Sequence, residues 1–202
     1  MKLYYSRGAC SLAPHILLRE TGLPFSLERV DTASHKTEHG SDFFAVNPKG
    51  YVPVLELDDG ARLTEGPVIC QYVCDVAKRN DLMPAAGTLA RYRVMEWQGY
   101  LNSEMHKSYG VLFDAALDST VKAKFATSLR TKYEWIDAQL KDGPYLTGTS
   151  FSAADAYLYN MTRWARYVKL ALADLTALQA FMQRTAERPS VLDAAKAESI
   201  PI

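Results

Sequence analysis

The sequence predicts an α/β domain at the N-terminus and an all-α domain at the C-terminus. Residues 1–80 contain five of the nine prolines and six of the eleven glycines, which is typical of short strands and helices joined by frequent turns. Residues 88–142 contain no proline, and their apolar residues recur at helical spacing. We therefore predict an α/β domain over residues 1–80, a linker over 81–87 and an all-helical domain over 88–202.

The first half of the α/β domain is predicted to contain two strands with a helix between them. Lys2–Tyr5 is a short strand candidate, and Phe25–Val30 alternates as a half-buried strand does. Between them, Ser11–Thr21 has apolar residues at helical spacing, and Gly22 marks the end of that helix. Pro14 falls in the first turn, where a missing N–H is tolerated.

The second half of this domain is predicted to be a hairpin followed by a helix, with a short helix before the hairpin. The Asp-Asp-Gly turn at residues 58–60 connects the strand Val52–Leu57 to the strand Ala61–Leu63, which makes the pair antiparallel. Pro67 then opens a helix, because proline is favoured in a first helical turn. The apolar face expected for this helix consists of Ile69, Tyr72, Val73 and Val76.

The C-terminal domain is predicted to consist of amphipathic helices. Leu89–Phe113 and Val121–Leu140 are the longest, and Ser152 with Asp155 has the spacing of a capping box that opens another. A further helix is expected over Leu175–Glu187. The apolar residues expected to face the core are Tyr92, Met95, Trp97, Leu101 and Met105 in the first helix, and Phe125, Leu129, Tyr133, Ile136 and Leu140 in the second.

Composition excludes several classes of protein. Lys plus Arg and Asp plus Glu both number 23, so the chain lacks the basic excess of a nucleic-acid binder. No apolar run approaches the ~20 residues of a membrane-spanning helix. The N-terminus has polar residues where a signal peptide needs an apolar stretch, so we expect a cytoplasmic protein. We do not expect the three cysteines to form a disulfide framework, and we predict that Cys70 and Cys74 are core residues on one helix.

Cys10 is the first residue that suggests chemistry. It lies where the first strand leads into the first helix, and the positive end of a helix dipole favours a thiolate. The alternative is a small buried packing residue, and the sequence leaves both interpretations open. Ser11, next to it, is a natural N-cap and need not react.

Two further segments suggest a ligand that carries charge and a peptide backbone. Pro53 at the entry of a strand leaves the backbone groups of Val52 facing outward, where an extended peptide could pair with them. Glu65 and Gly66 precede a helix N-terminus, which suits a carboxylate, while Glu65 suits an ammonium group. The alternatives are an edge-strand proline without a ligand and a glutamate that only caps its helix.

Taken together, the segments MKLYYSRGACSLAPH, NPKGYVPVL, LTEGPVI and SEMHKSY resemble the bacterial beta class of cytosolic glutathione transferases over essentially the whole chain. The resemblance implies a thioredoxin-like N-terminal domain, a homodimer, a cis Pro53 and no metal or cofactor beyond glutathione as co-substrate. It implies catalytic roles for Cys10, His106 and Lys107. The glutathione-binding residues that it implies are Cys10, His35, Lys36, Tyr51, Val52, Pro53, Glu65, Gly66, Ser103 (which reaches the partner subunit's glutathione) and His106.

The sequence departs from the beta-class pattern at three positions. Arg7 stands where relatives usually have proline, His35 where they often have lysine, and Gly99 where they often have asparagine. A histidine carries only a fractional charge at pH 7, so the expected contact with the glycine carboxylate of glutathione is weakened at His35, although Lys36 is adjacent. Without the resemblance, His106 would be read as a core histidine and Lys107 as a surface lysine.

The expected reaction is attack of the glutathione thiolate on a small hydrophobic electrophile, which gives a thioether. The electrophile is expected between the two domains, and the residues expected to line its site are Met105, Tyr109, Leu112, Phe113, Trp164 and Tyr167. One alternative is glutaredoxin-like thiol transfer that uses Cys10 alone, because Ala13 excludes a Cys-x-x-Cys pair. Another is a non-catalytic protein that binds glutathione or a hydrophobic ligand. We expect neither a nucleic acid nor a membrane as a partner.

Overall fold

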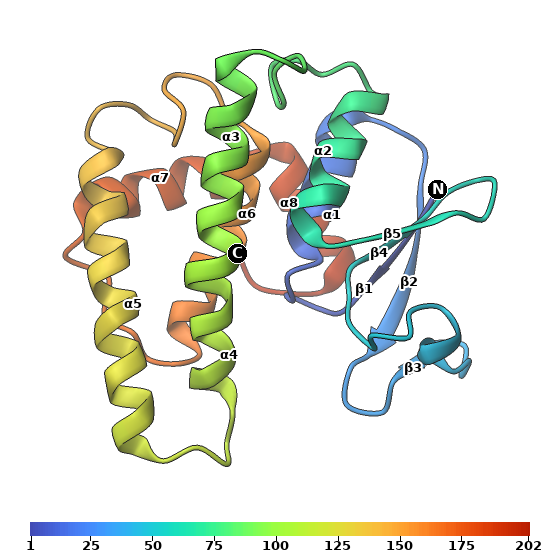
Figure 1. Ribbon diagram of the computed structural model, residues 1–202, viewed down its shortest axis with the longest axis horizontal. Coiled ribbons are helices and arrows are strands. Elements are labelled where there is room, and N and C mark those ends of the chain that lie inside the picture. The colour runs from blue at the N-terminus through green and yellow to red at the C-terminus, as the bar shows by residue number, and fades with distance from the viewer. The chain divides into compact units, whose positions relative to one another are not determined.

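A computed structural model describes residues 1–202, and the chain divides into two compact units. The first unit contains Met1–Asn80 and Glu187–Ile202, and the second contains Asp81–Ala186 (Figure 1). The first combines a sheet with helices and the second is helical, so the predicted fold class is confirmed. None of the helices combines the length and the apolar character that crossing a lipid bilayer requires.

A five-stranded mixed sheet organises the first unit, with strands in the order β3-β2-β1-β4-β5. The central strand β1 (Lys2–Tyr5) is parallel to β2 (Ser26–Asp31) and antiparallel to β4 (Val54–Glu56). The edge strands β3 (Lys36–Thr37) and β5 (Arg62–Thr64) are each antiparallel to their neighbour. The predicted hairpin is therefore confirmed as β4–β5. The sequence did not reveal β3, because two residues are too few to show an alternating pattern. A 3-10 turn, Phe43–Ala45, is the expected short helix.

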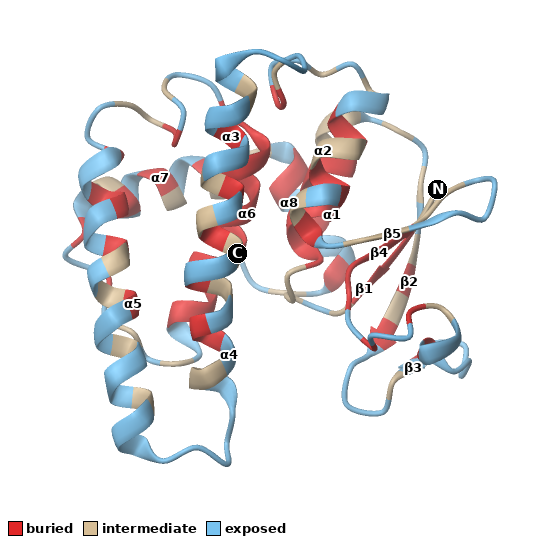
Figure 2. Ribbon diagram, in the orientation of Figure 1, coloured by how far each residue is buried: buried red, intermediate tan, exposed pale blue.

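Three helices pack in the first unit, and α1 (Leu12–Thr21) contacts both α2 (Gly66–Val76) and α8 (Pro189–Glu198). Every residue of α1 from Leu12 to Leu18 is buried, as its colour in Figure 2 shows. The face predicted for α2 was wrong in part, because Val76 is exposed. The residues that α2 buries are Gly66, Ile69, Cys70, Val73 and Cys74. Both cysteines are therefore core residues, as predicted, and they are not in a disulfide.

The C-terminal helix α8 belongs to the first unit, so the prediction of a helical domain that extends to residue 202 is wrong. The reason is a buried carboxylate near the end of α8. Glu198 accepts a hydrogen bond from the Gly8 N–H at 2.8 Å and lies 2.8 Å from His15 Nδ1, and both the Glu198 and His15 side chains are fully buried. The partners of this carboxylate lie in the first unit, 190 and 183 residues earlier in the chain.

The second unit has one long helical stretch, as predicted, and several shorter helices. The long stretch comprises α3 (Leu89–Tyr100), a π-helical segment (Leu101–His106) and α4 (Lys107–Phe113). The remaining elements are α5 (Ser119–Gln139), α6 (Ala153–Thr162), a 3-10 turn (Arg163–Arg166) and α7 (Thr176–Ala186). Residues 81–87, the predicted linker, form part of this unit, and Leu82 accepts the Ala153 N–H at 2.9 Å.

The apolar face predicted for the long stretch is only partly correct. Tyr92 and Met95 are 55% and 37% exposed, whereas Leu101 and Met105 are fully buried. The buried residues of α3 are Val94 and Gln98, because this is the side of α3 that faces the unit's core (Figure 2). In α5, Phe125 is likewise at the surface, and the buried apolar residues are Leu129, Tyr133 and Ile136, with Leu140 just beyond the helix.

The predicted capping box at the start of α6 is confirmed. The Ser152 N–H and hydroxyl donate to Asp155 Oδ2 at 2.8 and 2.6 Å, and the Leu146 N–H donates to Asp155 Oδ1 at 2.8 Å. Asp155 is fully buried, and burial raises the pKa of its carboxyl to about 6 despite these three hydrogen bonds. The carboxyl group of Asp155 thus connects the loop before α6 to the helix that it opens.

Candidate active site

The loop of residues 47–53 lies at the centre of the candidate site in the first unit. Asn47, which is buried, holds the loop closed. Its side-chain amide donates to the Tyr51 carbonyl at 2.7 Å, its side-chain oxygen accepts the Lys49 N–H at 3.2 Å, and its backbone carbonyl accepts the Gly50 N–H at 2.8 Å. Residues of this loop contact Cys10, Glu65 and His35, so it connects all three parts of the predicted glutathione site.

Cys10 and Val52 form the first of these contacts. The Cys10 thiol donates to the Val52 carbonyl at 3.2 Å, and Cys10 is half-buried while Val52 is buried. The Val52–Pro53 peptide bond is cis, as the resemblance implied. The sequence predicts that both backbone groups of Val52 face outward, but the carbonyl faces the Cys10 thiol. The Val52 N–H forms no hydrogen bond within the protein, which leaves one donor for the main chain of a ligand.

The turn that presents Cys10 is fixed by neighbouring groups. Ser11 occupies the N-cap position of α1, but its hydroxyl does not cap the helix. Instead, Ser11 Oγ donates to the Ser6 carbonyl and accepts the Ser6 N–H, both at 3.2 Å. Gly8 has a φ of 65°, which suits glycine, and its N–H donates to Glu198. Arg7 is exposed. Cys10 therefore lies between a turn closed by Ser11 and the start of α1.

Glu65 and Lys49 form the second contact. Lys49 Nζ lies 2.6 Å from Glu65 Oε1 and donates to Thr64 Oγ1 at 2.8 Å. Glu65 has a φ of 67° and a ψ of 113°, a conformation that costs a residue with a Cβ roughly 1–3 kcal/mol and that is found mostly at ligand sites. The Glu65 side chain does not cap α2, so the capping interpretation is wrong. Gly66 is the buried first residue of α2.

His35 and Gly50 form the third contact. Gly50 has a φ of 71°, and a Cβ at this position would lie 2.8 Å from Phe44 and 3.1 Å from the His35 ring, so only glycine fits. The His35 ring packs on Phe44 with centroids 4.4 Å apart, and its Nδ1 is buried without a hydrogen-bond partner. Lys36 follows in β3 and is exposed, and Tyr51 is 72% exposed.

In the second unit, His106 and its neighbours lie where the π-helical segment joins α4. The ring of His106 is half-buried, and its Nδ1 lies 2.8 Å from the hydroxyl of Tyr157. Lys107 and Ser103 are exposed, and the Ser103 hydroxyl donates to the Gly99 carbonyl at 3.0 Å. Single-turn π segments occur frequently at functional sites.

Part of the predicted electrophile site is an aromatic cluster in the second unit. The Trp164 ring lies 5.1 Å from His106, 5.4 Å from Tyr109 and 6.1 Å from Phe113, measured between centroids. Met105 and Tyr109 are fully buried, and the Tyr109 hydroxyl lies 2.8 Å from that of Tyr133. Among the remaining predicted residues, Leu112 is half-buried, Phe113 is 48% exposed, and Tyr167 is 58% exposed and packs on the Arg166 guanidinium.

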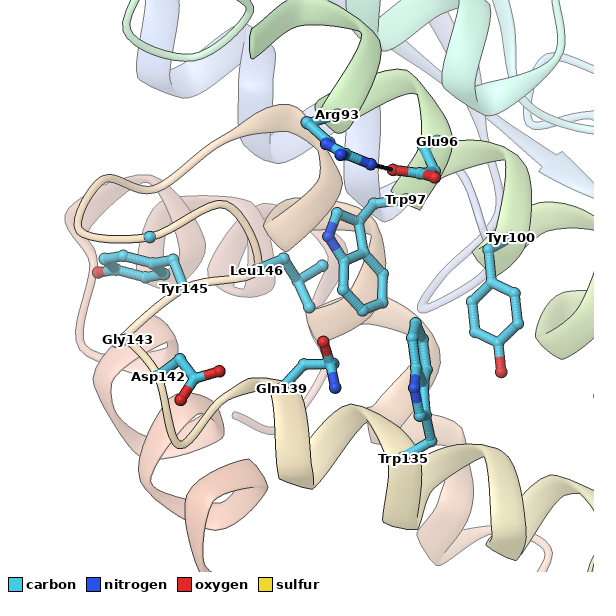
Figure 3. A pocket seen from close by; sticks show the side chains of 11 residues that line it. Arg93, Glu96, Trp97, Tyr100, Trp135, Gln139, Asp142, Gly143, Tyr145 and Leu146 are labelled. Atoms are coloured by element: carbon cyan, nitrogen blue, oxygen red, sulfur yellow. Dashed lines mark hydrogen bonds and ion pairs between the residues drawn. The ribbon is translucent and has the colours of Figure 1, made fainter. Parts of the chain in front are cut away.

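A separate cavity of about 620 Å³ lies in the second unit (Figure 3). Its aromatic side is formed by Trp97, Tyr100 and Trp135, and the ring centroids of the two tryptophans are 5.0 Å apart. Leu146, Gln139 and Asp142 also line it, and the Arg93–Glu96 ion pair lies at one side of Figure 3. It includes none of the residues predicted to bind glutathione or the electrophile.

The sequence patterns do not single out Asn47, Lys49 or Tyr157. The first two lie in the quoted segment NPKGYVPVL, where an Asn-Pro turn before a strand was a usable signal for a structured loop. Tyr157 gave no such signal, because it resembles any aromatic residue on a buried helix. Its contact with His106 joins residues 51 positions apart in the chain.

Comparison with known proteins identifies the family. Residues 8–76 match the model of the glutathione S-transferase N-terminal domain, and residues 114–184 match that of the C-terminal domain. Glutathione S-transferase GstA of Escherichia coli O157:H7 is 46% identical over 200 residues, which cover 99% of this chain and 100% of GstA.

Solved structures agree in fold and length. A ternary complex of BphK, a bacterial glutathione S-transferase, has a TM-score of 0.97 at 48% identity and covers 99% of this chain and 100% of its own. A sphingomonad glutathione S-transferase complexed with glutathione has a TM-score of 0.95 at 45% identity, and the bacterial beta-class enzyme of Sphingomonas chungbukensis has 0.96 at 43%; each covers both chains completely. The chain therefore belongs to the glutathione S-transferase family and is similar throughout its length to the bacterial beta class, as its sequence motifs predicted.

Proposed function

We propose that this glutathione S-transferase joins the thiolate of glutathione to small hydrophobic electrophiles. The observation that carries the proposal is the convergence of Cys10, Glu65 and His35 on the loop of residues 47–53. A charged tripeptide needs a backbone donor, groups for both of its charged ends and a thiol partner, and this loop has all of them nearby. The sphingomonad relative, described as complexed with glutathione, supports the same ligand here.

In the proposed binding mode, each part of glutathione contacts a group of the protein described above. The γ-glutamyl ammonium pairs with Glu65, and its carboxylate with Lys49 and the positive end of α2 beginning at Gly66. The main-chain carbonyl of the cysteinyl residue accepts a hydrogen bond from the Val52 N–H, which has no partner within the protein. The glycine carboxylate meets Lys36 and His35. Tyr51 and cis Pro53 belong to the same loop, and Ser103 contributes to the glutathione of a partner subunit.

Catalysis requires stabilisation of the thiolate, because free glutathione is mostly protonated near neutral pH. Lowering its pKa by one unit takes ~1.4 kcal/mol of preferential stabilisation of the anion. The Cys10 S–H, once turned from the Val52 carbonyl to the ligand, donates to the sulfur, and the start of α1 adds a positive dipole. His106 and Lys107 supply further donors and positive charge.

In the bond-forming step, the thiolate electron pair forms the new S–C bond, and the leaving group departs with its own pair. The thiol proton is released. With a halide as the electrophile, the thiol and the halide are therefore converted to a thioether, a halide ion and a proton. This displacement needs neither a metal nor a resident cofactor. The aromatic cluster around Trp164 and Phe113 is suited to an apolar electrophile.

The test is a conjugation assay with an activated aryl chloride and glutathione. We expect a thioether product, detected by mass spectrometry, with a rate that saturates in glutathione. A protein that binds glutathione in calorimetry but does not accelerate thioether formation above the uncatalysed rate, with aryl halides, epoxides or activated alkenes, is the non-catalytic binder.

We also propose a homodimer in the reducing cytoplasm. Leu89, Tyr92 and Met95 expose apolar side chains along α3, which fits a surface covered by a second copy. Three free cysteines fit a reducing compartment. Light scattering at micromolar concentration should give twice the monomer mass, and a stable, active monomer would contradict the dimer.

A further inference from the structure

Three aromatic rings form one wall of the cavity in the second unit. Its volume of about 620 Å³ lies within the ~300–1,000 Å³ typical of small-molecule sites. Trp97 and Tyr100 come from α3 and Trp135 from α5 (Figure 3). The centroids of the Trp97 and Tyr100 rings lie 5.0 and 5.1 Å from that of Trp135. Trp135 is nevertheless 46% exposed, so the wall offers a surface on which the flat ring of a ligand can stack.

These rings lie away from both the core face of α3 and its exposed apolar stripe. Arg93, Trp97 and Tyr100 are four and three residues apart, so they share one face of the helix. The core face carries Val94 and Gln98. The exposed apolar side chains of α3 that fit a second copy do not line the cavity. The cavity is therefore built by a third face of α3, which remains available to a ligand.

The charges that line the cavity leave one carboxylate without a counter-charge. Its charged side chains are those of Arg93, Glu96 and Asp142. Arg93 Nη1 and Glu96 Oε2 form an ion pair at 2.7 Å, so the guanidinium charge is already neutralised. The Asp142 carboxylate forms no ion pair, and in Figure 3 it lies with Gln139 and Trp135 on the side of the cavity opposite the Arg93–Glu96 pair. The cavity therefore favours a ligand with positive charge over an anion.

We propose that this cavity is a binding site for a planar aromatic cation. The ring system of the ligand stacks on Trp97 and Trp135, and its positive charge faces the Asp142 carboxylate. The faces of aromatic rings are electron-rich, so tryptophan attracts a cation by electrostatics as well as by dispersion. A neutral aromatic ligand gains the stacking alone, and an aromatic anion is repelled by the carboxylate. None of the cavity residues is assigned to glutathione or to the electrophile, so the proposal goes beyond the proposed function and does not rest on it.

The direct test is an NMR titration with 1-methylquinolinium, a permanent aromatic cation, in the absence of glutathione. The chain has three tryptophans, and Trp97→Phe and Trp135→Phe assign their indole N–H signals. We expect the signals of Trp97 and Trp135 to shift saturably. The signal of Trp164, which lies in the aromatic cluster proposed for the electrophile, should stay in place.

Two further probes of similar shape test the selection for charge. Calorimetry measures the dissociation constants of 1-methylquinolinium, of neutral quinoline and of the anion naphthalene-1-sulfonate. Quinoline should bind about threefold more weakly than the cation, the size expected for one exposed charge pair. The sulfonate should bind more weakly than quinoline. Added salt should weaken binding of the cation and leave that of quinoline unchanged, because salt screens exposed charges.

Variants separate the aromatic wall from the carboxylate. Trp135→Leu should weaken 1-methylquinolinium about fivefold to tenfold, because it removes a stacking and cation–π surface. Its matched control is Phe125→Leu, which removes an exposed ring of α5 that does not line the cavity. Asp142→Asn should weaken the cation about twofold to fivefold and leave quinoline unchanged. Asp193→Asn, which removes an exposed carboxylate of α8, should change neither.

Several results would overturn the proposal. A shift of Trp164 alone would place the cation elsewhere, and no shift of any tryptophan signal would show that the cavity is closed or covered in the assembled protein. Equal affinities for the three probes would show an apolar pocket without charge selection. Equal losses in Trp135→Leu and Phe125→Leu would indicate a general effect on the helix. None of these readouts uses conjugation, so absence of thioether formation would contradict the proposed function and leave this test intact.

Discussion

Lys49 Nζ lies 2.6 Å from Glu65 Oε1, so a cation and a carboxylate stand side by side just before the N-terminus of α2. The γ-glutamyl end of glutathione carries the same two charges close together. A ligand of this kind can exchange partners with the pair, its ammonium going to Glu65 and its carboxylate to Lys49. The left-handed backbone of Glu65, with no cap to explain it, fits a residue held for binding.

Glu65→Gln keeps the size of the side chain and removes its charge. We expect glutathione affinity to fall by more than ~1 kcal/mol, the amount typical of a lost cap, because an ammonium loses its counter-ion. The unfolding free energy should change by less than about 0.5 kcal/mol, since the ion pair with Lys49 is exposed. Calorimetry and urea unfolding measure the two. Glu96→Gln, which breaks the exposed pair with Arg93, is the control and should leave affinity unchanged. A large loss of stability with unchanged affinity would assign Glu65 a structural role.

Lys49→Met tests the other half of the pair. If Lys49 receives the ligand carboxylate, glutathione affinity should fall about fivefold to tenfold, the size expected for a hydrogen bond to a charged group. Titration with glutathione and with a glutathione analogue that lacks the γ-glutamyl carboxylate measures this. The variant and the wild type should bind the analogue equally. Tighter binding of glutathione by Lys49→Met would show that Lys49 only competes with the ligand for Glu65.

Cys10→Ala separates two uses of the sulfur. Conjugation depends on the bound glutathione thiolate, so it should persist at a reduced rate, supported by the start of α1. Disulfide exchange needs Cys10 to carry the mixed disulfide, so it should be abolished. Mass spectrometry after treatment with oxidised glutathione should find the adduct on Cys10 of the wild type, since the other cysteines are buried and burial raises the pKa of the Cys70 thiol. Full exchange activity in Cys10→Ala, or no adduct on Cys10, contradicts this assignment.

Asp155 gives a pH dependence of stability. Burial raises its carboxyl pKa from 3.8 to about 6, so between these values the folded protein binds a proton that the unfolded chain has released. The contribution of Asp155 to the free energy of unfolding is thus greatest below pH 4, and it falls by about 3 kcal/mol as the pH rises past 6. Urea unfolding from pH 4 to 7 should show this decline in the wild type. In Asp155→Asn, the protein should be less stable overall, because an acceptor is lost, and the slope over this range should be flatter. Equal slopes in the two proteins would contradict the raised pKa.

Local patterns predicted most of the secondary structure. Gly22 ends α1 with a φ of 68°, Pro67 lies in the first turn of α2, and Ser152 with Asp155 opens α6, because each signal acts within a few residues. The assignment of α8 to the second unit was wrong, because the decisive contact joins Glu198 to His15 and Gly8 far away in the chain. No local pattern reports such a contact.

The sequence likewise predicted some parts of the candidate site and not others. The motifs led to Cys10, Pro53 and Glu65, and the structure connects these residues through one loop. The roles of Lys49 and Asn47 depend on how that loop folds back on Glu65 and Tyr51, which spacing does not reveal. The hydrogen bond between His106 and Tyr157 depends on the placement of α6 beside the π-helical segment, so only three-dimensional structure shows it.

The central claim is that this protein binds glutathione and lowers the pKa of its thiol. Ultraviolet difference spectroscopy of the thiolate, followed as a function of pH with glutathione bound, tests it most directly. We predict that binding produces thiolate absorption at a pH at least one unit below that at which free glutathione ionises, which corresponds to ~1.4 kcal/mol. The signal should persist, shifted to higher pH, in Cys10→Ala, and it should be absent with a glutathione analogue that has a hydroxyl in place of the thiol. Ionisation of bound glutathione at the same pH as the free thiol would contradict the account.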